Sequence, residues 1–235
     1  MNVAVVRFPG SNCDLDVVSA LRVIGGLKPK LVWHEDGGLA DFDALVLPGG
    51  FSFGDYLRAG AIAARSPAIA QVRRLADKGV PVLGICNGFQ ILVEAGLLPG
   101  TLLRNSGLKF VCKWVNLRVE NDRTPFTRCS ESGAVLRVPI AHNEGRMFLP
   151  TSDVKALRRD GRVVFRYSDA AGVPCDEGNP NGSQDNIAGI CSKEGNVVGM
   201  MPHPERASDP ILGAEGTADG RAIFESLARF EGRAS

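Results

Sequence analysis

The feature that most constrains the fold is a strand that runs directly into a helix within residues 80–95. An apolar, strand-forming run covers 80–85, and a helical stretch follows it. Glycines stand two positions before and two positions after the junction residue Cys86, which is the pattern of a nucleophile elbow with Cys in place of Ser. Because side chains at Gly84 and Gly88 would collide with neighbouring elements, we expect a sharp turn that points Cys86 out at the carboxyl end of a sheet.

The first half of the chain alternates between strand and helix signals. Strands are expected at 3–8, 31–33 and 44–47, and helices at 11–24 and 66–79. Ser11 and Asn12 offer capping side chains for the first helix, and Ser66-Pro67 is a favourable start for the second. This alternation predicts right-handed βαβ units and an α/β, flavodoxin-like fold, with a mostly parallel open sheet and helices on both faces.

The second half of the chain has a different character. Strand candidates with little helix between them lie at 110–119, 134–140, 163–167, 187–191 and 197–200, and a final helix is expected over 219–230. We interpret these strands as the remainder of the sheet plus an additional antiparallel layer. At 235 residues, with no internal repeat or long linker, the chain is expected to form a single domain over 1–235.

A cysteine nucleophile needs a histidine as its base, and the chain has three histidines. Prolines on both sides of His203 favour extended backbone, so its side chain and that of Glu205 can point the same way. The carboxylate can then hold one ring nitrogen while the other faces the thiol. His142 also has a carboxylate two residues on, at Glu144, and the residues alone leave it open as the base; His34 ends a strand and is interpreted as structural.

Formation of a thioester on a cysteine passes through a tetrahedral oxyanion, which needs backbone N–H donors that are already in position. Elbow geometry places the N–H of Asn87, the first after the nucleophile, for this role. The glycine-bearing loop 47–56 supplies Gly50 as a candidate for the second donor, with an ordinary strand-to-helix turn as the alternative reading.

Composition excludes several other classes. The net charge of +1 argues against a nucleic-acid binder, and no apolar run is long enough to cross a membrane. The six cysteines are scattered without a CxxC pair, so neither a disulfide scaffold nor a zinc site is expected. The start of the chain lacks the pattern of a signal peptide, so we expect a reduced, cytoplasmic protein. Cys13 is the only rival nucleophile, and it lacks the flanking glycines.

These motifs together resemble the class I (triad) glutamine amidotransferases, and among them the family of small glutaminase subunits of phosphoribosylformylglycinamidine synthases. The Cys-x-Gly-x-Gln and His-Pro-Glu pieces belong to the class, whereas GGFSFGDYLRAG, NPNGS and RVEN are specific to the subunit family. The similarity covers nearly the whole chain, at 8–14, 47–63, 84–100, 104–121, 140–145, 179–190 and 199–206. One departure is Phe53, where the family commonly has Tyr.

The resemblance implies a role for each matching residue. Cys86 would be the nucleophile, and His203, rather than His142, would be its base, oriented by Glu205. Gly50 and Asn87 would line the oxyanion hole, and Gln90 matches a class residue near the substrate glutamine. The implied chemistry is hydrolysis of glutamine to glutamate and ammonia through a thioester.

The resemblance also implies partners. In such synthases the ammonia reaches a second site, where ATP activates the amide oxygen of formylglycinamide ribonucleotide and ammonia converts it to the amidine. This chain has no G-x-x-x-x-G-K-[ST] phosphate loop, so no cofactor or metal is expected in it. ATP and Mg²⁺ are expected in a large synthetase subunit, and a small third subunit is expected to join the two.

Three other readings remain. A stand-alone cysteine hydrolase on the same fold would need no partner and no glutamine pocket. A regulatory module that had lost catalysis would not need the intact Cys, His and Glu set. A glutaminase serving another synthetase, such as one that makes guanylate, would share the site. Protection of the thiol by glutamine, and the identity of the synthetase that co-purifies, distinguish these readings.

Overall fold

The computed structural model describes residues 1–230. Its first half follows the predicted alternation of strands and helices, with bounds within a few residues of the expected ones. The elements are β1 (Asn2–Arg7), α1 (Asp14–Arg22), β2 (Lys28–Trp33), β3 (Ala44–Leu47), α2 (Pro67–Asp77), β4 (Val82–Ile85) and α3 (Asn87–Glu94).

The second half contains mostly strands. All five predicted strands are present, together with two short strands and one helix that the sequence analysis did not predict. The elements are β5 (Thr101–Arg104), β6 (Val111–Val119), β7 (Val135–His142), β8 (Glu144–Phe148), α4 (Thr151–Arg159), β9 (Val163–Ser168), β10 (Ile187–Cys191), β11 (Val197–Met200) and α5 (Arg221–Ala228).

The strands form one large mixed sheet in the order β2-β1-β3-β4-β11-β10-β9-β6-β7. Pairing is parallel from β2 to β11 and antiparallel from β11 to β7. The expected α/β fold is therefore confirmed, and most of the antiparallel strands extend the same sheet. A separate two-stranded antiparallel sheet, β5-β8, adds the smaller layer.

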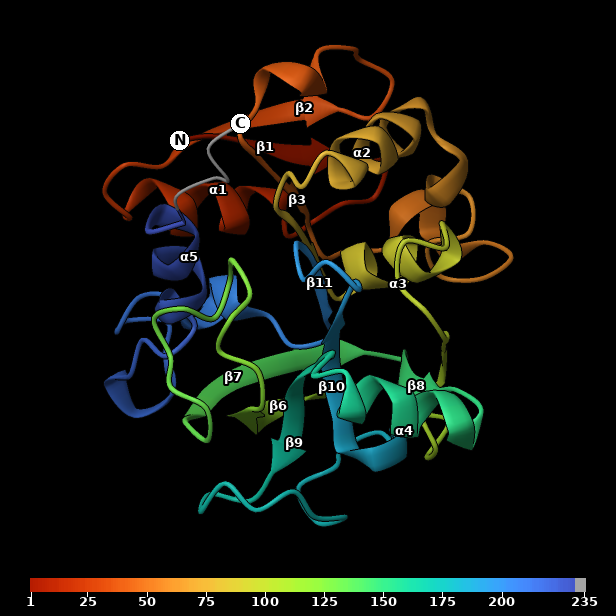
Figure 1. The fold of residues 1–235 in the computed structure, drawn as a ribbon, viewed down its shortest axis with the longest axis vertical. Coiled ribbons are helices and arrows are strands. Elements are labelled where there is room, and N and C mark those ends of the chain that lie inside the picture. Colours follow the sequence, from red (N-terminus) through yellow and green to blue (C-terminus); the bar gives the residue numbers. More distant parts are fainter. Residues whose placement is uncertain (231–235) are drawn as a thin grey trace.

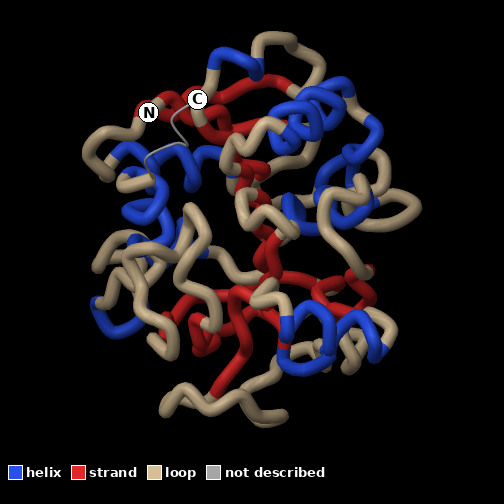
Figure 2. Tube along the Cα trace, in the orientation of Figure 1, coloured by secondary structure: helices blue, strands red, loops and turns tan. Residues whose placement is uncertain are grey.

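Helices cover both faces of the parallel strands, as predicted. Figure 1 shows α1 and α5 on one side of these strands and α2 and α3 on the other. The predicted apolar face of α2 is buried, and it includes Ile69 and Val72. Figure 2 shows that the antiparallel end has fewer helices, with α4 and long loops around it. Among the described helices, none combines the length and the apolar character needed to cross a membrane.

Two details differ from the sequence prediction. The first helix begins after Cys13, and no side chain caps it, whereas Ser11 or Asn12 was expected as the cap. The hydroxyl of Ser11 instead accepts a hydrogen bond from the Phe8 N–H (3.1 Å), which closes the turn after β1. The unpredicted helix α4 is short and mostly polar, and Leu157 is its only buried residue, with Val154 partly buried one turn before it.

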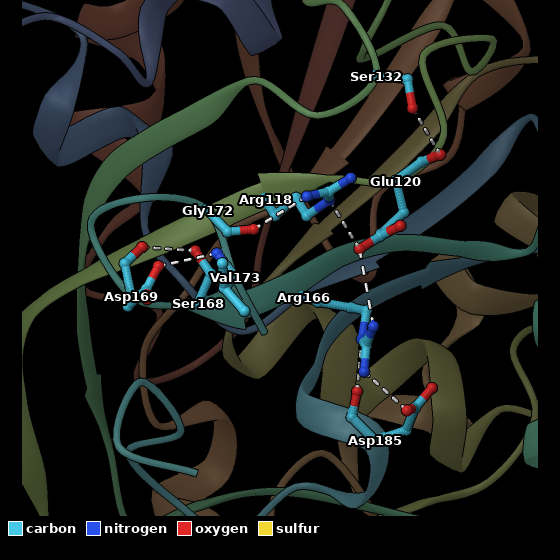
Figure 3. Close-up of polar contacts among 9 residues, drawn as sticks. All are labelled: Arg118, Glu120, Ser132, Arg166, Ser168, Asp169, Gly172, Val173 and Asp185. Carbon is cyan, nitrogen blue, oxygen red and sulfur yellow. Dashed lines mark hydrogen bonds and ion pairs between the residues drawn. The ribbon is translucent and has the colours of Figure 1, made fainter. Parts of the chain in front are cut away.

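Ion pairs fix the segment before β10 against the antiparallel strands (Figure 3). Arg166 on β9 contacts the carboxylate of Asp185 at 2.8 Å and donates to its backbone carbonyl at 2.7 Å. On its other side Arg166 lies 3.9 Å from Glu120, which also pairs with Arg118 at 3.3 Å. These contacts hold in place the end of the NPNGSQDN stretch, which reaches toward the candidate site.

Candidate active site

The predicted elbow is present at Cys86. Cys86 lies between β4 and α3. Its backbone angles are φ 49° and ψ −104°, which residues other than glycine rarely adopt. A Cβ at Gly88 would lie 2.0 Å from the carbonyl oxygen of Leu47, and one at Gly84 would lie 2.7 Å from the carbonyl oxygen of Gly88. The two glycines therefore let β4, α3 and β3 approach closely enough for the sharp turn to form.

The Cys86 side chain is buried, with 3% of the residue exposed. Its backbone N–H donates to Met200 at the end of β11 (2.8 Å), and its sulfur lies 3.8 Å from the carbonyl oxygen of Ala141. The thiol therefore lies at the carboxyl ends of β4 and β11, at the amino end of α3.

A buried His–Glu pair comes from the strand next to the elbow. His203 and Glu205 follow β11, which pairs in parallel with β4. Nδ1 of His203 lies 2.6 Å from Oε1 of Glu205, and the two side chains are 1% and 0% exposed. Because a carboxylate only accepts, Nδ1 is the protonated nitrogen, and Nε2 has no hydrogen-bond partner within residues 1–230. Nε2 is thus available to exchange a proton.

The charges around His203 favour its protonated form. Burial lowers the pKa of His203, but the negative charges of Glu205 and Cys86 outweigh burial and raise it well above the usual value. The imidazolium is the form that the base has after it takes the proton of a cysteine.

His142, the alternative base, has a different environment. Its Nδ1 lies 3.1 Å from Oδ1 of Asn105, whose amide nitrogen donates to the carbonyl oxygens of His142 and Lys109. Oδ1 is therefore the acceptor and Nδ1 the donor. Burial, followed by the positive charge of His203, lowers the pKa of His142 to about 3. The carboxylate of Glu144 instead accepts from the N–H of Ala59 at 3.5 Å. The geometry favours His203 over His142 as the base.

Gly50 and Asn87 present the two candidate oxyanion donors. Gly50 has φ 142°, and a Cβ on it would lie 2.7 Å from the backbone N of Asn12, so only glycine fits. Across residues 1–230, the backbone N–H groups of Gly50 and Asn87 have no protein acceptor. The side-chain oxygen of Asn87 accepts from the Ser52 N–H (3.1 Å) and so joins the loop after β3 to α3.

Both polar atoms of the Gln90 side chain form hydrogen bonds within the protein. Its amide nitrogen donates to the carbonyl oxygen of Glu144 at 2.5 Å, and its oxygen accepts from the side chain of Asn87 at 2.9 Å. Asp55 lies at the same place, 3.4 Å from the amide nitrogen of Asn87, and burial followed by the charge of Glu144 raises its pKa to about 6. Gln90 therefore links α3 to the start of β8 beside the nucleophile.

The NPNGS stretch also contacts the start of β8. The side chain of Asn181 donates to the carbonyl oxygen of Gly145 (2.9 Å), while Asn179 accepts from the N–H groups of Gly182 and Ser183. A Cβ at Gly145 would lie 2.4 Å from the ring of His142, so the glycine lets the imidazole pack against the backbone. The stretch therefore orders the segment that carries Glu144.

One neighbour of the His–Glu pair was missed by the sequence analysis. The sulfur of Cys13 accepts a hydrogen bond from Nη2 of Arg206 at 3.0 Å. The sulfur of Cys13, a ring nitrogen of His203 and a carboxylate oxygen of Glu205 all lie within 4.8 Å of one another. The FPGSNCD match places Cys13 in a motif, but nothing in that motif indicates that its thiol meets residues almost 200 positions away.

A cysteine at an elbow beside a buried His–Glu pair, at the carboxyl ends of parallel strands, is the arrangement of a cysteine-dependent amide hydrolase on an α/β sheet. Residues 1–230 match the CobB/CobQ-like glutamine amidotransferase domain. The chain belongs to this family, and within it to the phosphoribosylformylglycinamidine synthase subunits PurQ.

The relatives are similar along their full length. The PurQ subunit of Aquifex aeolicus is 55% identical over 97% of this chain and 99% of its own, and that of Methanosarcina acetivorans is 52% identical over 98% of each. A chain in the structure of PurLQS from Thermotoga maritima superposes with a TM-score of 0.84 at 45% identity, covering 96% of both chains. A glutamine amidotransferase from the same organism, 18% identical with a TM-score of 0.54 over 90% of this chain and 78% of its own, shares the fold.

Proposed function

We propose that this chain is the glutaminase subunit of a phosphoribosylformylglycinamidine synthase and releases ammonia from glutamine. The observation that carries the proposal is the buried His203–Glu205 pair beside the elbow Cys86, in a chain similar over its full length to PurQ subunits. Cys86 is the nucleophile, His203 the general base and acid, and Glu205 the group that orients the imidazole.

In the first half-reaction the Cys86 thiol transfers its proton to Nε2 of His203. The thiolate attacks the side-chain carboxamide carbon of glutamine, and the carbonyl oxygen becomes an oxyanion. As the tetrahedral intermediate collapses, the C–N bond breaks and His203 returns its proton to the departing ammonia. A γ-glutamyl thioester remains on Cys86.

In the second half-reaction water hydrolyses the thioester. Nε2 of His203 takes a proton from the attacking water, and a second tetrahedral intermediate forms. When this intermediate collapses, the C–S bond breaks, glutamate leaves and the Cys86 sulfur is reprotonated from His203. Glu205 keeps the ring oriented throughout, since its contact with Nδ1 does not involve the nitrogen that exchanges protons.

Gly50 and Asn87 are proposed to stabilise the oxyanion through their backbone N–H groups. The lack of protein acceptors for these groups within residues 1–230 supports that role, because a free donor can be aimed at developing negative charge. Gln90 is proposed to form part of the wall of the glutamine pocket. Its two hydrogen bonds to Asn87 and Glu144 would keep that wall rigid.

The ammonia is proposed to pass to a large synthetase subunit, joined by a small third subunit. ATP and Mg²⁺ would act there on formylglycinamide ribonucleotide, and this chain would need no cofactor of its own. Similarity to a chain of PurLQS from Thermotoga maritima supports association with two such partners. We also propose that the chain works in the cytoplasm, where the nucleophilic thiol would stay reduced.

The loop after β3 is proposed to couple glutamine hydrolysis to the partner. Phe53, Asp55 and Leu57 all have positive φ. Residues other than glycine rarely adopt such angles, so the loop is not expected to keep this conformation without support from another protein. Tyr56 and Leu57 are 75% and 92% exposed, so they are free to pack against another protein. Contact with the synthetase would hold the loop, and with it Gly50, in the active arrangement. The free chain would then hydrolyse glutamine slowly, and adding the synthetase would raise kcat.

Co-expression with candidate synthetases, followed by a glutamine-dependent amidation assay, tests the proposal. We expect the chain to co-purify with a synthetase that forms the amidine from formylglycinamide ribonucleotide. Co-purification with a guanylate-forming synthetase instead would identify a different amidotransferase. Rapid hydrolysis of peptides or esters by the chain alone, without protection of Cys86 by glutamine, would identify a stand-alone hydrolase.

A further inference from the structure

A second thiol borders the His–Glu pair. Cys13 is 2% exposed, and its sulfur, a ring nitrogen of His203 and a carboxylate oxygen of Glu205 lie within 4.8 Å of one another. None of the steps proposed above uses Cys13. Thiolate, imidazole and carboxylate are also the three kinds of ligand that Zn²⁺ and similar divalent ions bind in proteins.

The space between these groups comes from Gly49. A Cβ at this position would lie 3.2 Å from Sγ of Cys13, 3.3 Å from Nδ1 of His203 and 2.6 Å from Cε1 of the same ring. Any side chain here would therefore fill the gap between the thiol and the imidazole. Glycine leaves it open.

Two buried polar atoms of this cluster have no hydrogen-bond partner within residues 1–230, Nε2 of His203 and Oε2 of Glu205. Glu205 therefore has an oxygen to offer a cation without giving up a protein contact. Two ligands on one tetrahedral Zn²⁺ lie roughly 3.5 Å apart, given metal–ligand distances of about 2.0–2.3 Å. The observed separations of up to 4.8 Å are about 1.3 Å longer than that spacing.

We propose that Cys13, His203 and Glu205 form an inhibitory site for a divalent transition metal ion of the Zn²⁺ type. The Cys13 thiol would lose its proton to solvent on binding, and Sγ, a ring nitrogen and a carboxylate oxygen would coordinate the ion. Water would take the fourth position. The site is distinct from the nucleophile, because Cys86 is not a ligand.

Coordination would stop catalysis through the tautomer of His203. With the metal on Nδ1, the remaining proton must sit on Nε2, which then cannot accept the proton of Cys86. With the metal on Nε2, that nitrogen is blocked directly. In both cases the imidazole loses the lone pair that the base needs.

Arg206 is the partly exposed neighbour through which the cluster meets solvent. Its side chain is 37% exposed, donates to Sγ of Cys13 at 3.0 Å and lies 3.7 Å from Asp16 on the surface of α1. Rotation of Arg206 toward Asp16 would uncover the sulfur.

Binding of Co²⁺, a spectroscopic substitute for Zn²⁺, tests the site on the purified full-length chain. We expect a thiolate-to-cobalt charge-transfer band that Zn²⁺ abolishes by competition. Cys13→Ser and Cys13→Ala should both lose the band. Cys86→Ser should keep it, as should Cys112→Ser, the control for an exposed thiol. Glu205→Gln should weaken Zn²⁺ binding by at least about tenfold.

Loss of the band in Cys86→Ser with retention in Cys13→Ser would overturn the proposal, since the ion would then sit on the nucleophile. Absence of any band in the folded wild type would overturn it too. Inhibition of glutamine hydrolysis is the second arm, and it rests on the proposed function. Zn²⁺ should inhibit the wild type at concentrations at least about tenfold lower than those that inhibit Cys13→Ser. If the chain has no glutaminase activity, only the inhibition experiment gives no result, because cobalt binding does not depend on catalysis.

Discussion

His203 and Glu205, two positions apart on the segment after β11, are joined by a 2.6 Å contact between Nδ1 and Oε1. Their side chains are 1% and 0% exposed, so the carboxylate acts on the imidazole with little screening by solvent. The pair holds the ring in one tautomer and leaves Nε2 without a hydrogen-bond partner within residues 1–230. The chemistry proposed for this chain depends on that relationship.

The first prediction concerns the reactivity of the thiols. Cys86 is buried but stands at a helix amino end beside His203, whereas Cys112 is exposed and has neither feature. Limited labelling with iodoacetamide near neutral pH should modify Cys86 first, and glutamine should slow its labelling only. Mass-spectrometric mapping checks this. Faster labelling of Cys13, with no protection of Cys86 by glutamine, would refute the choice of nucleophile.

The second prediction separates the two candidate bases. His203→Ala should lower glutamine hydrolysis by about 100- to 10,000-fold, the usual cost of losing a general base. Glu205→Gln should lose less, because the carboxylate orients the ring without exchanging protons. His142→Asn should stay within a few fold of wild type, because its ring holds Asn105 and carries no charge near neutral pH. An inactive His142→Asn beside a near-normal His203→Ala would reverse the choice of base.

The third prediction concerns the elbow. Gly88→Ala should destabilise the fold by about 3 kcal/mol or more, because its Cβ would lie 2.0 Å from the backbone oxygen of Leu47, which cannot move aside as a side chain can. Gly25→Ala is the matched control, since no atom lies within 4 Å of its added Cβ. Urea unfolding of both variants measures the difference. Equal stability of the two would mean that β3 and α3 are not packed as described.

The fourth prediction is a pH dependence of stability. The pKa of His142 is about 3 in the folded chain and 6.5 ordinarily, so between these values the unfolded state binds the extra proton. The free energy of unfolding must then fall as pH falls through this window. From pH 7 to pH 5 the wild type should lose about 2 kcal/mol more than His142→Asn, which keeps a donor for Asn105 but does not titrate. Parallel curves for the two proteins in urea would contradict the burial of a neutral His142.

Much of this site could be predicted because its parts are local. The elbow could be predicted from Gly84, Cys86 and Gly88, because the lack of side chains at the two glycines lets the neighbouring backbone approach closely at the turn. The side chains of His203 and Glu205 meet as predicted, but not on the extended backbone that was expected, because a 3-10 helix over Pro204–Ala207 begins directly after His203. The pairing of β4 with β11 was not predicted, because these strands lie more than 100 residues apart and local sequence does not indicate which distant strands pair.

The parts that were missed depend on tertiary contacts. His142 and His203 share the same spacing to a carboxylate, and only the structure shows that Glu144 accepts from Ala59 instead of holding His142. Cys13 meets Arg206 because the turn after β1 packs beside the segment after β11. Helix α4 was not predicted because it is short and its apolar face consists of little more than Val154 and Leu157.

Product formation by the reconstituted synthase with glutamine or with ammonium salt, for wild type and Cys86→Ala, tests the central claim most directly. Cys86 is proposed to make ammonia and nothing else, and the replacement keeps both elbow glycines. The variant complex should therefore lose amidine formation from glutamine and retain it from high ammonium, with a rate that rises with pH as the fraction of free NH₃ rises. Loss of both activities in a variant that is folded and still bound to its partners would contradict the account, because this chain would then take part in the synthetase step itself.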